Sequence, residues 1–586
     1  MSLNTLKDEL NQALRQAVEA VAGDQASAVA ADRLVFGPTK QPEHGDMASS
    51  AAMALSKPLG KPPVEIAEAL AAQLRQSPYI ASAEVARPGF VNVRLSSRAL
   101  EYVLRSIQSD GNSFGDSTLG QGRTVLIEFV SANPTGPMHI GHCRHAATGD
   151  ALTRILRAAN YKVTTEFYIN DAGNQIAALG HSFRFRCLRA AGIVDDSEVR
   201  EEQDLENAGR TLTFFEGERV QYTGEYLDEF AADFVKHKSP EELRAMTKAE
   251  YAWEARNRNL EQIQADLAAL GVFFDSYVSE RALHDEGAVE RTLERIKNSG
   301  VAYEKEGALW LRTQDYGDNE DRVMVKSDGS FTYLVPDVAY HHNKFERGYD
   351  LYINVFGADH AGYPPRLRAG IAAVGHDPSK LQVILLRLVF LKKMGERVKF
   401  SKRAGNFVAL ADVVEDAGPD ATRWFMLCRS TDSEFEFDMD LALQEDNQNP
   451  VFKVQYAHAR ICSLERKGQE RGLVALNDPA RAAAFLTAPI EKDMLVFLAQ
   501  FPEIVERSAR ELAVHHVPAY ALAVADLWNR YWAMAKTDPS FRILENEPNL
   551  AGARLMLASS IRQVLANALG LLGITAPTRM VREEEE

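Results

Sequence analysis

Cysteine is scarce in this sequence, and long hydrophobic segments are missing. No two of its cysteines form a C-x-x-C pair, so neither a cysteine zinc site nor a disulfide framework is expected. The four cysteines are Cys143, Cys187, Cys428 and Cys462. Free thiols are typical of a reducing compartment, which predicts a cytoplasmic protein. The most apolar short run, residues 385–391, contains Arg387 and is too short to cross a bilayer, so we expect a buried strand there and no membrane partner.

A surplus of positive charge is missing as well. The formal net charge is −16 over 586 residues. A protein whose only task is to bind nucleic acid is usually basic, so this balance argues weakly against RNA binding. A local basic face is enough to follow a phosphate backbone, however, and an RNA partner therefore stays open.

The length is too great for a single hydrophobic core and predicts several domains. Residues 1–116 begin as a helix and end in a strand-like segment and a turn-rich stretch, which predicts a small α+β domain. Residues 117–447 begin with an apolar strand, a loop, a helix and a second strand. This order is the start of a doubly wound α/β domain, and a polar helical stretch at about 180–305 predicts an insertion in it. Residues 448–586 have almost no strand pattern and predict a helical bundle.

One segment stands between the first strand of the predicted α/β domain and its first helix. It reads Ser131, Ala132, Asn133, Pro134, Thr135, Gly136, Pro137, Met138, His139, Ile140, Gly141 and His142. Free backbone N–H groups and the helix dipole make this position a phosphate site in α/β proteins. His139 and His142 share one helical face, where two imidazole donors can stabilise a phosphate, and Gly141 lets a nucleotide approach the backbone. For a bare H-x-x-H pattern, two surface histidines would be the better interpretation, but the whole string in this place favours a nucleotide site.

A second segment, residues 398–406, follows two β-like runs at 351–356 and 382–386, which we expect to complete the same sheet. Lys399 and Lys402 in this segment can neutralise a triphosphate. A basic surface loop is the usual explanation of such a pattern. Together with the first segment, and in this order, it indicates an ATP site.

These two segments carry a resemblance to a known family. His139 to His142 resembles the HIGH signature of class I aminoacyl-tRNA synthetases. Residues 399–403 resemble their KMSKS signature, with Phe400 in place of Met and Arg403 in place of the last Ser. The context from Asn133 to Pro137 is similar to that of arginyl-tRNA synthetases of the bacterial type. Further similar segments are residues 44–46, 88–90, 168–175, 222–226, 326–330, 332–340, 357–360 and 454–460, so the resemblance extends over nearly the whole chain.

The resemblance implies a fold, a reaction and its substrates. We expect a multidomain chain of α/β plus α class, with a Rossmann-like catalytic domain, a small N-terminal tRNA-binding domain and a C-terminal anticodon-binding bundle. Such an enzyme activates arginine with ATP and Mg²⁺, releases pyrophosphate and passes arginine to the terminal adenosine of its tRNA. It positions its reactants and stabilises charge without a covalent enzyme intermediate. A monomer is expected, with no editing domain and no tightly bound metal.

The resemblance also assigns residues to the two substrate sites. A guanidinium carries five donors and needs a carboxylate and an aromatic face. The arginine pocket then contains Glu128, Ser131, Asn133, Tyr333 and Asp337. We assign Asp337 to the guanidinium and Asn133 to the α-amino or carboxylate end. The ATP-binding residues are His139, Gly141, His142, Gly357, Asp359, Lys399, Ser401 and Lys402, and the catalytic ones among them are His139, His142, Lys399 and Lys402.

Some of these residues have a second interpretation. Asp337 could simply open a helix, where a carboxylate is favourable. Glu128 could be a buried partner of a backbone donor, and His360 could pack beside the loop that follows the strand. The pairs 341–342 and 515–516 are histidines without an acidic or cysteine partner at ligand spacing, so we expect ordinary surface or core residues there.

Three other functions compete with this one. A small nucleotidyl transferase shares the H-x-G-H pattern but has no need of a long C-terminal helical region. A non-catalytic RNA-binding relative would have a broken signature. A class I synthetase for another amino acid, such as cysteine or leucine, agrees less well with the string 131–142 and the pair of Tyr333 and Asp337. Pyrophosphate exchange against a panel of amino acids separates these alternatives.

Overall fold

The computed structural model describes residues 5–39, 42–204, 211–397 and 408–580. The chain divides into two compact units, one with residues 1–120, 158–160 and 444–586 and the other with residues 121–157 and 161–443. None of the helices in the described ranges is both long and apolar enough to span a membrane. The second unit holds the described residues of both predicted substrate sites.

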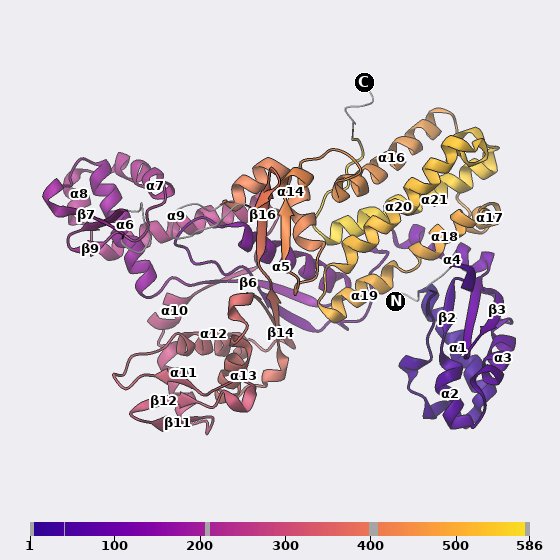
Figure 1. Cartoon of the computed structure of the whole chain (residues 1–586), viewed down its shortest axis with the longest axis horizontal. Coiled ribbons are helices and arrows are strands. Elements are labelled where there is room, and N and C mark those ends of the chain that lie inside the picture. The colour runs from indigo at the N-terminus through magenta and orange to yellow at the C-terminus, as the bar shows by residue number, and fades with distance from the viewer. Residues whose placement is uncertain (1–4, 40–41, 205–210, 398–407, 581–586) are drawn as a thin grey trace. The chain divides into compact units, whose positions relative to one another are not determined.

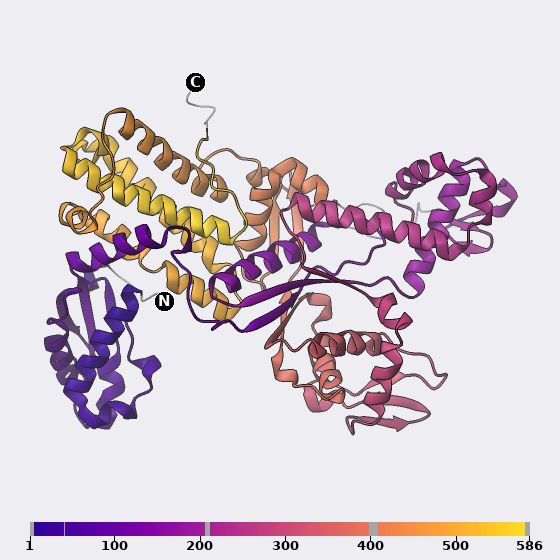
Figure 2. The same ribbon diagram turned by 180° about the vertical axis from the view of Figure 1, so that it is seen from behind.

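A five-stranded parallel sheet forms the centre of the second unit (Figure 1, and from behind Figure 2). Its strands are β5 (Thr124–Glu128), β6 (Lys162–Ile169), β10 (Ser276–Ser279), β14 (Leu351–Gly357) and β15 (Leu381–Leu386), in the order β10-β6-β5-β14-β15. Val125, Leu126 and Ile127 of β5 are buried, as expected of a strand covered on both faces. The chain adds strands on one side of β5 and then on the other, so β5 and β14 flank a topological switch point. The prediction of a doubly wound α/β fold is confirmed.

Three helices of this domain position the candidate site. α5 (Ile140–Ala158) connects β5 to β6, while α12 (Leu334–Glu346) and α13 (Tyr363–Ala373) precede and follow β14. α12 and α13 share one buried hydrophobic cluster. They approach closely at Gly370, where a Cβ atom would lie 2.3 Å from Cγ2 of Val338. This glycine therefore permits the tight contact between the two helices.

Two inserted pieces interrupt the sheet. Between β6 and β10, a subdomain packs around a core that includes Phe183 and Tyr251. It consists of α6 (Asn174–Ala190), β7 (Val199–Gln203), β8 (Thr211–Phe215), β9 (Glu218–Arg219), α7 (Tyr226–Phe234), α8 (Pro240–Ala245) and α9 (Lys248–Ala269). Between β10 and α12 lie α10 (Glu280–Asp285), α11 (Ala288–Lys297), β11 (Ala302–Lys305), β12 (Ala308–Leu311) and β13 (Arg322–Val325). The stretch predicted as one insertion, about 180–305, thus contains β10, an edge strand of the central sheet. Its four partly exposed residues carry no hydrophobic pattern strong enough to reveal it.

The apolar run at 385–391 differs from the prediction. It forms two strands, the end of β15 and the start of β16 (Val389–Lys393), separated by Arg387 and an exposed Leu388. The carbonyl of Arg387 accepts a hydrogen bond from the buried guanidinium of Arg144 at 2.7 Å, which fixes the break. The remaining elements of this unit are β17 (Glu396–Arg397), α14 (Leu410–Leu427), β18 (Phe435–Asp438) and α15 (Met439–Ala442).

The first unit contains a small α+β structure and a set of helices. Its N-terminal elements are α1 (Leu6–Ala22), β1 (Gly37–Pro38), β2 (Met47–Ser49), α2 (Ala51–Leu59), α3 (Pro63–Leu74), β3 (Ile80–Ala86), β4 (Phe90–Leu95) and α4 (Ser97–Asp110). The strands form a sheet in the order β1-β2-β4-β3. Leu6, Leu10, Leu14 and Val18 form the buried stripe of α1, so the amphipathic pattern of the first residues is that of a core-facing helix.

The C-terminal region is helical, and its described residues 448–580 contain no strand. Its helices are α16 (Pro450–Glu470), α17 (Pro479–Phe485), α18 (Pro489–Leu498), α19 (Phe501–Glu511), α20 (His516–Thr537) and α21 (Pro548–Leu571). Four of them begin at a proline, whose fixed φ angle suits the first helical position and whose missing N–H is not needed there. The predicted helical bundle is confirmed.

Candidate active site

The segment after β5 turns sharply before α5 begins. Val130 and Ser131 have φ angles of 67° and 42°, which non-glycine residues rarely adopt. The hydroxyl of Ser131 donates to Oε1 of Glu128 at 2.9 Å and accepts from the backbone N–H of Tyr168 at 3.1 Å. These bonds tie the ends of β5 and β6 together. Strained backbone of this kind is retained where surrounding contacts hold it, and such positions cluster at functional sites.

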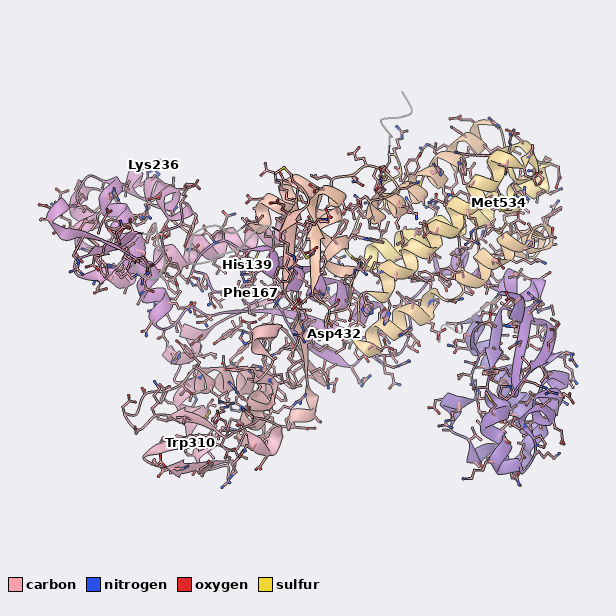
Figure 3. All side chains as sticks on the ribbon, viewed as in Figure 1. His139, Phe167, Lys236, Trp310, Asp432 and Met534 are labelled. Atoms are coloured by element: carbon pink, nitrogen blue, oxygen red, sulfur yellow. The ribbon has the colours of Figure 1, made fainter. Side chains whose placement is uncertain are left out.

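The two signature histidines lie together at the start of α5 (His139 is labelled in Figure 3). Their rings are stacked, with centroids 3.9 Å apart and planes inclined by 16°. Nδ1 of His139 accepts from the backbone N–H of Gly141 at 3.1 Å, and Nδ1 of His142 accepts from that of His139 at 3.3 Å. Since both Nδ1 atoms accept, Nε2 is the donor nitrogen in each neutral ring. A Cβ atom on Gly141 would lie 2.8 Å from the ring of His139, so a side chain there would disturb the pair.

The start of α14 is joined to the same segment. His139 and Ala409 form an isolated antiparallel bridge, and the backbone N–H of Leu410 donates to the carbonyl of Met138 at 2.8 Å. Ala409 follows the second signature closely in the chain. The predicted site residues Lys399, Ser401 and Lys402 lie outside the described residues, as do the two substituted positions Phe400 and Arg403. The bridge nevertheless places the described residues that follow the second signature next to His139.

Glu128 is buried in a network of side chains. Its second oxygen accepts from the ammonium of Lys344, which also donates to Oδ1 of Asn354 at 2.9 Å. Both Glu128 and Lys344 are almost fully buried, at 4% and 1% exposure. The sequence left open whether Glu128 serves a substrate or a backbone donor. Its partners are instead the side chains of Lys344 and Ser131.

Asp337 sits in the first turn of α12, and its backbone carbonyl is linked to this network through His341 and Asn354. It is half-buried, and the hydroxyl of Tyr363 donates to its Oδ2. Burial raises the pKa of Asp337 to about 7, the hydrogen bond from Tyr363 opposes this shift, and the negative charges of Glu280 and Glu128 add to it. Among the described residues no lysine, arginine or histidine forms an ion pair with Asp337. The carboxylate therefore lacks a cationic partner within the described part of the chain.

Tyr333 stands four residues before Asp337 and caps the start of α12 with its backbone. Its side chain is 81% exposed, an unusual state for a tyrosine that borders a buried cluster. α12 begins at Leu334, so Asp337 does lie in a helix start, as one interpretation of the sequence expected. The side chain of Asp337, however, accepts its hydrogen bond from the hydroxyl of Tyr363 and not from a backbone N–H of the helix.

The loop between β5 and α5 is also held by the inserted subdomain. The amide of Asn133 donates to Oε1 of Gln175 at 2.9 Å, and the hydroxyl of Tyr226 donates to the carbonyl of Thr135 at 2.8 Å. Asn133 itself is exposed. Its bond to Gln175 keeps a polar amide near the buried Glu128 network.

Gly357 and Asp359 lie at the end of β14, beside α5. A Cβ atom on Gly357 would approach Oδ1 of Asp359 to 2.4 Å, so a side chain here would displace the exposed carboxylate of Asp359. The carboxylate of Asp359 is exposed and lies 3.7 Å from Nε2 of His360. His145 of α5 borders the same loop, and burial lowers its pKa to about 4, with Asp359 opposing the shift. The two loops that flank the switch point thus meet at His145.

Several residues of this arrangement were missed from the sequence. Tyr363, Glu280 and Lys344 surround Asp337 and Glu128 but come from three separate elements. His145 could have been found, because it continues the three-residue spacing of His139 and His142 along α5.

The histidines outside this site were partly misjudged. His341 is a core residue, as expected: its Nδ1 donates to the carbonyl of Asp337 and burial lowers its pKa to about 3. His342 was expected to have no acidic partner at ligand spacing, which is wrong. Glu346 follows it by one helical turn, and Oε1 of Glu346 lies 3.9 Å from Nδ1 of His342. His516 likewise bonds to Oε2 of Glu511 at 2.8 Å.

Three family profiles match this chain in succession. They are described as arginyl tRNA synthetase N terminal domain at residues 4–95, tRNA synthetases class I (R), catalytic domain, at residues 104–445, and DALR anticodon binding domain at residues 454–580. The catalytic profile covers the switch point and all the described site residues, and it spans more than half of the chain.

Curated relatives agree with the profiles. Arginine–tRNA ligase 1 of Halalkalibacterium halodurans is 41% identical over 579 residues, which is 98% of this chain and 99% of that protein. Arginine–tRNA ligase of Nitratidesulfovibrio vulgaris is 42% identical over 556 residues, 94% of this chain and 96% of that protein. The solved structure of Thermus thermophilus arginyl-tRNA synthetase shares the fold, with a TM-score of 0.73 and 24% identity over 98% of this chain and 100% of that chain. With its paired histidines at the switch point and these relatives over nearly its full length, the chain belongs to the arginyl-tRNA synthetase family and is a class I aminoacyl-tRNA ligase.

Proposed function

We propose that this arginine–tRNA ligase binds the guanidinium of arginine at Asp337 and the phosphates of ATP at His139 and His142. The arginine carboxylate attacks the α-phosphorus of ATP and pyrophosphate leaves. The terminal adenosine of the tRNA then attacks the arginyl-adenylate, and AMP leaves. ATP enters as its magnesium complex, so the ion belongs to the substrate.

The carboxylate of Asp337, on which the charge of Lys344 acts but which forms no ion pair among the described residues, is the observation that carries the arginine site. It is half-buried near the charges of Glu280 and Glu128, and among the described residues its hydrogen-bond donor is the phenol of Tyr363. Such a carboxylate is destabilised in its charged form, and a cation brought by the substrate would remove the penalty. A guanidinium stays charged at every relevant pH and offers donors to both carboxylate oxygens.

The neighbouring residues suit the rest of the amino acid. The exposed ring of Tyr333 can stack on the guanidinium plane. The amide of Asn133 is suited to the α-amino or carboxylate end. Glu128 and Ser131 form the wall between the guanidinium end and the α-amino end, and the buried contact with Lys344 fixes Glu128 in place.

The ATP site follows from the start of α5. The Nε2 donors of His139 and His142, together with the first turn of the helix, stabilise negative charge that develops on the phosphates. Lys399, Ser401 and Lys402 supply further donors to the triphosphate, and Gly357 and Asp359 border the adenosine. These groups position the reactants and stabilise the developing charge, and they remain chemically unchanged.

We further propose how the parts of the chain share the work. Residues 117–447 carry the chemistry, residues 448–586 contact the anticodon, and residues 1–116 contact another part of the tRNA. A monomer in the cytoplasm remains our expectation. The support for the anticodon role is the profile match at residues 454–580.

The test of the arginine site is Asp337→Ala, measured by arginine-dependent pyrophosphate exchange with the cognate tRNA present. Leaving a buried substrate cation unpaired costs about 3–5 kcal/mol, so kcat/KM for arginine should fall by more than ~100-fold. The KM for ATP should stay within about twofold, because ATP lies across the switch point.

Asp377→Ala is the matched control, since that carboxylate only accepts from the backbone N–H of Ser379 in an exposed turn. If Asp337 only favoured the start of α12, its loss would cost about 0.3–1 kcal/mol of stability and leave arginine kinetics unchanged. A normal arginine KM with a slightly lower melting temperature would therefore remove Asp337 from the substrate site.

A further inference from the structure

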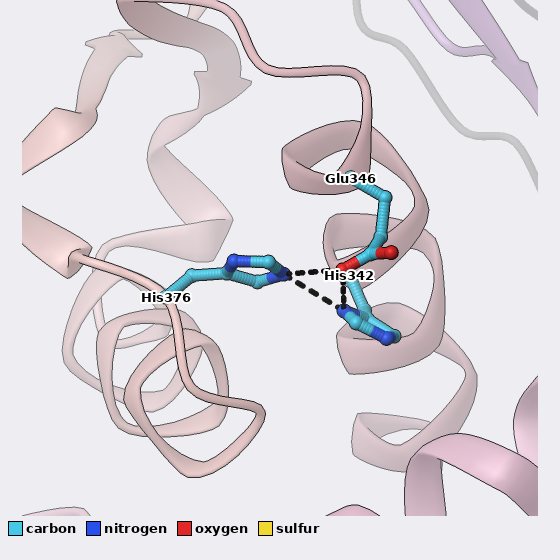
Figure 4. Close-up of side chains that lie close together, drawn as sticks. All are labelled: His342, Glu346 and His376. Atoms are coloured by element: carbon cyan, nitrogen blue, oxygen red, sulfur yellow. Dashed lines mark hydrogen bonds and ion pairs between the residues drawn. The ribbon is translucent and has the colours of Figure 1, made fainter.

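A second cluster of ligand-type side chains lies at the other ends of α12 and α13. His342, Glu346 and His376 converge there (Figure 4), and within the described ranges no other three His, Cys, Asp or Glu side chains converge as closely. Nδ1 of His342 lies 2.8 Å from Nε2 of His376. Oε1 of Glu346 lies 3.9 Å from the first of these atoms and 3.6 Å from the second.

The backbone fixes all three residues. His342 and Glu346 are one turn apart on the same face of α12. α13 ends in a Schellman motif: Gly375, with a φ of 88°, donates to the carbonyl of Ala372 at 3.0 Å, and the N–H of His376 donates to that of Ile371 at 3.0 Å. This ending aims His376 at α12, where its ring packs against Phe345 with centroids 5.2 Å apart.

The two imidazoles would bind a metal ion in their neutral form. Burial lowers the pKa of His342 and that of His376, while the charge of Glu346 opposes both shifts. One of the two facing nitrogens carries the hydrogen of their mutual bond, so ligation needs only a tautomer shift in that ring.

We propose that His342, Glu346 and His376 bind a Zn²⁺ ion, with water as the fourth ligand. The three ligand atoms lie on a circle with a radius of about 2.0 Å, and the usual Zn–N and Zn–O distances are about 2.0–2.2 Å. An ion close to the centre of this circle is within bonding distance of all three atoms, and small rotations of the side chains would turn their lone pairs toward it and give a tetrahedral arrangement with the water. Glu346 is more than half exposed, which leaves a path for the ion and room for the water.

The ligand set selects the kind of metal. Two imidazoles and one carboxylate suit Zn²⁺ and its first-row neighbours, whereas Mg²⁺ and Ca²⁺ prefer oxygen ligands alone. The positive charges of Arg295 and Lys380 act on His376 and oppose a cation. Affinity must therefore come from direct bonds to the three ligands, and Mg²⁺ or Ca²⁺ at millimolar concentration should not compete.

The ion would join the last turn of α12 to the end of α13. The first turns of the same two helices carry Asp337 and Tyr363, whose hydrogen bond borders the arginine site. A ligand that binds only the folded chain raises its stability. Zn²⁺ should therefore raise the melting temperature of the full chain, and this outcome is independent of the substrate assignments above.

The experiment is a titration of the full-length, chelator-treated protein with Co²⁺, followed by displacement with Zn²⁺. We expect one equivalent of Co²⁺ to give the visible absorption of a four-coordinate ion, and Zn²⁺ to abolish it. His376→Gln and Glu346→Gln should each weaken binding by more than about 100-fold, since even residues behind metal ligands contribute about 10–100-fold. Their melting temperatures without metal should match that of the wild type, because glutamine keeps a polar group in each place.

His516→Ala is the matched control. It removes another partly buried imidazole that has a single carboxylate partner, Glu511, and so offers only two ligands. Binding unchanged by this variant but lost in the two others supports the site. Wild-type protein that takes up no Co²⁺ or Zn²⁺, or His376→Gln and Glu346→Gln variants that bind as tightly as wild type, would overturn the proposal.

Discussion

At the scale of single residues, Asp337, the proposed partner of the substrate guanidinium, makes the folded chain less stable when it is ionised. Its pKa of about 7 lies above the ordinary value of an aspartate, so the folded chain resists ionisation of this group. The folded state then holds more protons than the unfolded state between roughly pH 4 and pH 7. Stability from this residue is complete below that window and is lost as the pH rises through it.

Replacement of Asp337 by asparagine should therefore stabilise the protein without substrate. The amide of the new side chain could keep the bond from Tyr363 and would carry no charge to desolvate. We expect Asp337→Asn to raise the free energy of unfolding by about 1–3 kcal/mol at pH 8 and by less at pH 5. Urea unfolding at pH 8 and at pH 5 measures this difference in the free energy of unfolding. If the variant is less stable than wild type at pH 8, the carboxylate of Asp337 stabilises the folded state.

The neighbours of Asp337 explain which parts of the site the sequence could reveal. The string from Ser131 to His142 is local, so its place between a strand and a helix could be predicted. Lys344 and Tyr363 are far from that string in the sequence, and their contacts with Glu128 and Asp337 arise only from packing. A lysine in a helix is normally exposed, so nothing local marked Lys344 as buried.

At the scale of elements, the start of α5 and the end of β14 form the proposed nucleotide side of the site. The strands could be predicted because apolar runs such as residues 125–130 suit a sheet covered on both faces. β10 could not, because four residues give too little pattern to distinguish a strand from a loop. The sequence indicated α12 only through Asp337, yet this helix carries Asp337 of the proposed arginine site at one end and both His342 and Glu346 of the proposed metal site at the other.

The paired histidines of α5 should act mainly in the transition state. Their Nε2 donors meet charge that grows as the arginine carboxylate attacks the α-phosphorus. His142→Ala should lower kcat by roughly 10²–10³-fold with little change in the KM for arginine. His237→Ala, an exposed histidine in the inserted subdomain, is the control for the loss of an imidazole. Steady-state aminoacylation measures both, and an unchanged kcat in His142→Ala would exclude that ring from the mechanism.

At the scale of the whole molecule, the first and last parts of the chain belong to one compact unit and the catalytic domain to the other. The turn-rich stretch predicted as a boundary at residues 110–116 is anchored, because the amide of Asn567 donates to the carbonyl of Phe114 at 2.8 Å and to that of Gly111 at 2.9 Å. A turn-rich composition predicts a domain boundary at this place, but it does not predict the hydrogen bonds that hold the stretch to a distant residue. Such long-range bonds are invisible in a sequence, since they join residues far apart in the chain.

Selection of the amino acid through the charge of Asp337 is tested directly by a comparison of two ligands. Arginine and citrulline have nearly the same shape, but citrulline carries a neutral urea group in place of the guanidinium. Equilibrium binding of both is measured with wild type and with Asp337→Asn, in the presence of the cognate tRNA. We expect wild type to prefer arginine by more than ~100-fold and the variant to bind the two within about tenfold of each other. If Asp337→Asn keeps the full preference for arginine, the charge of Asp337 does not select the amino acid.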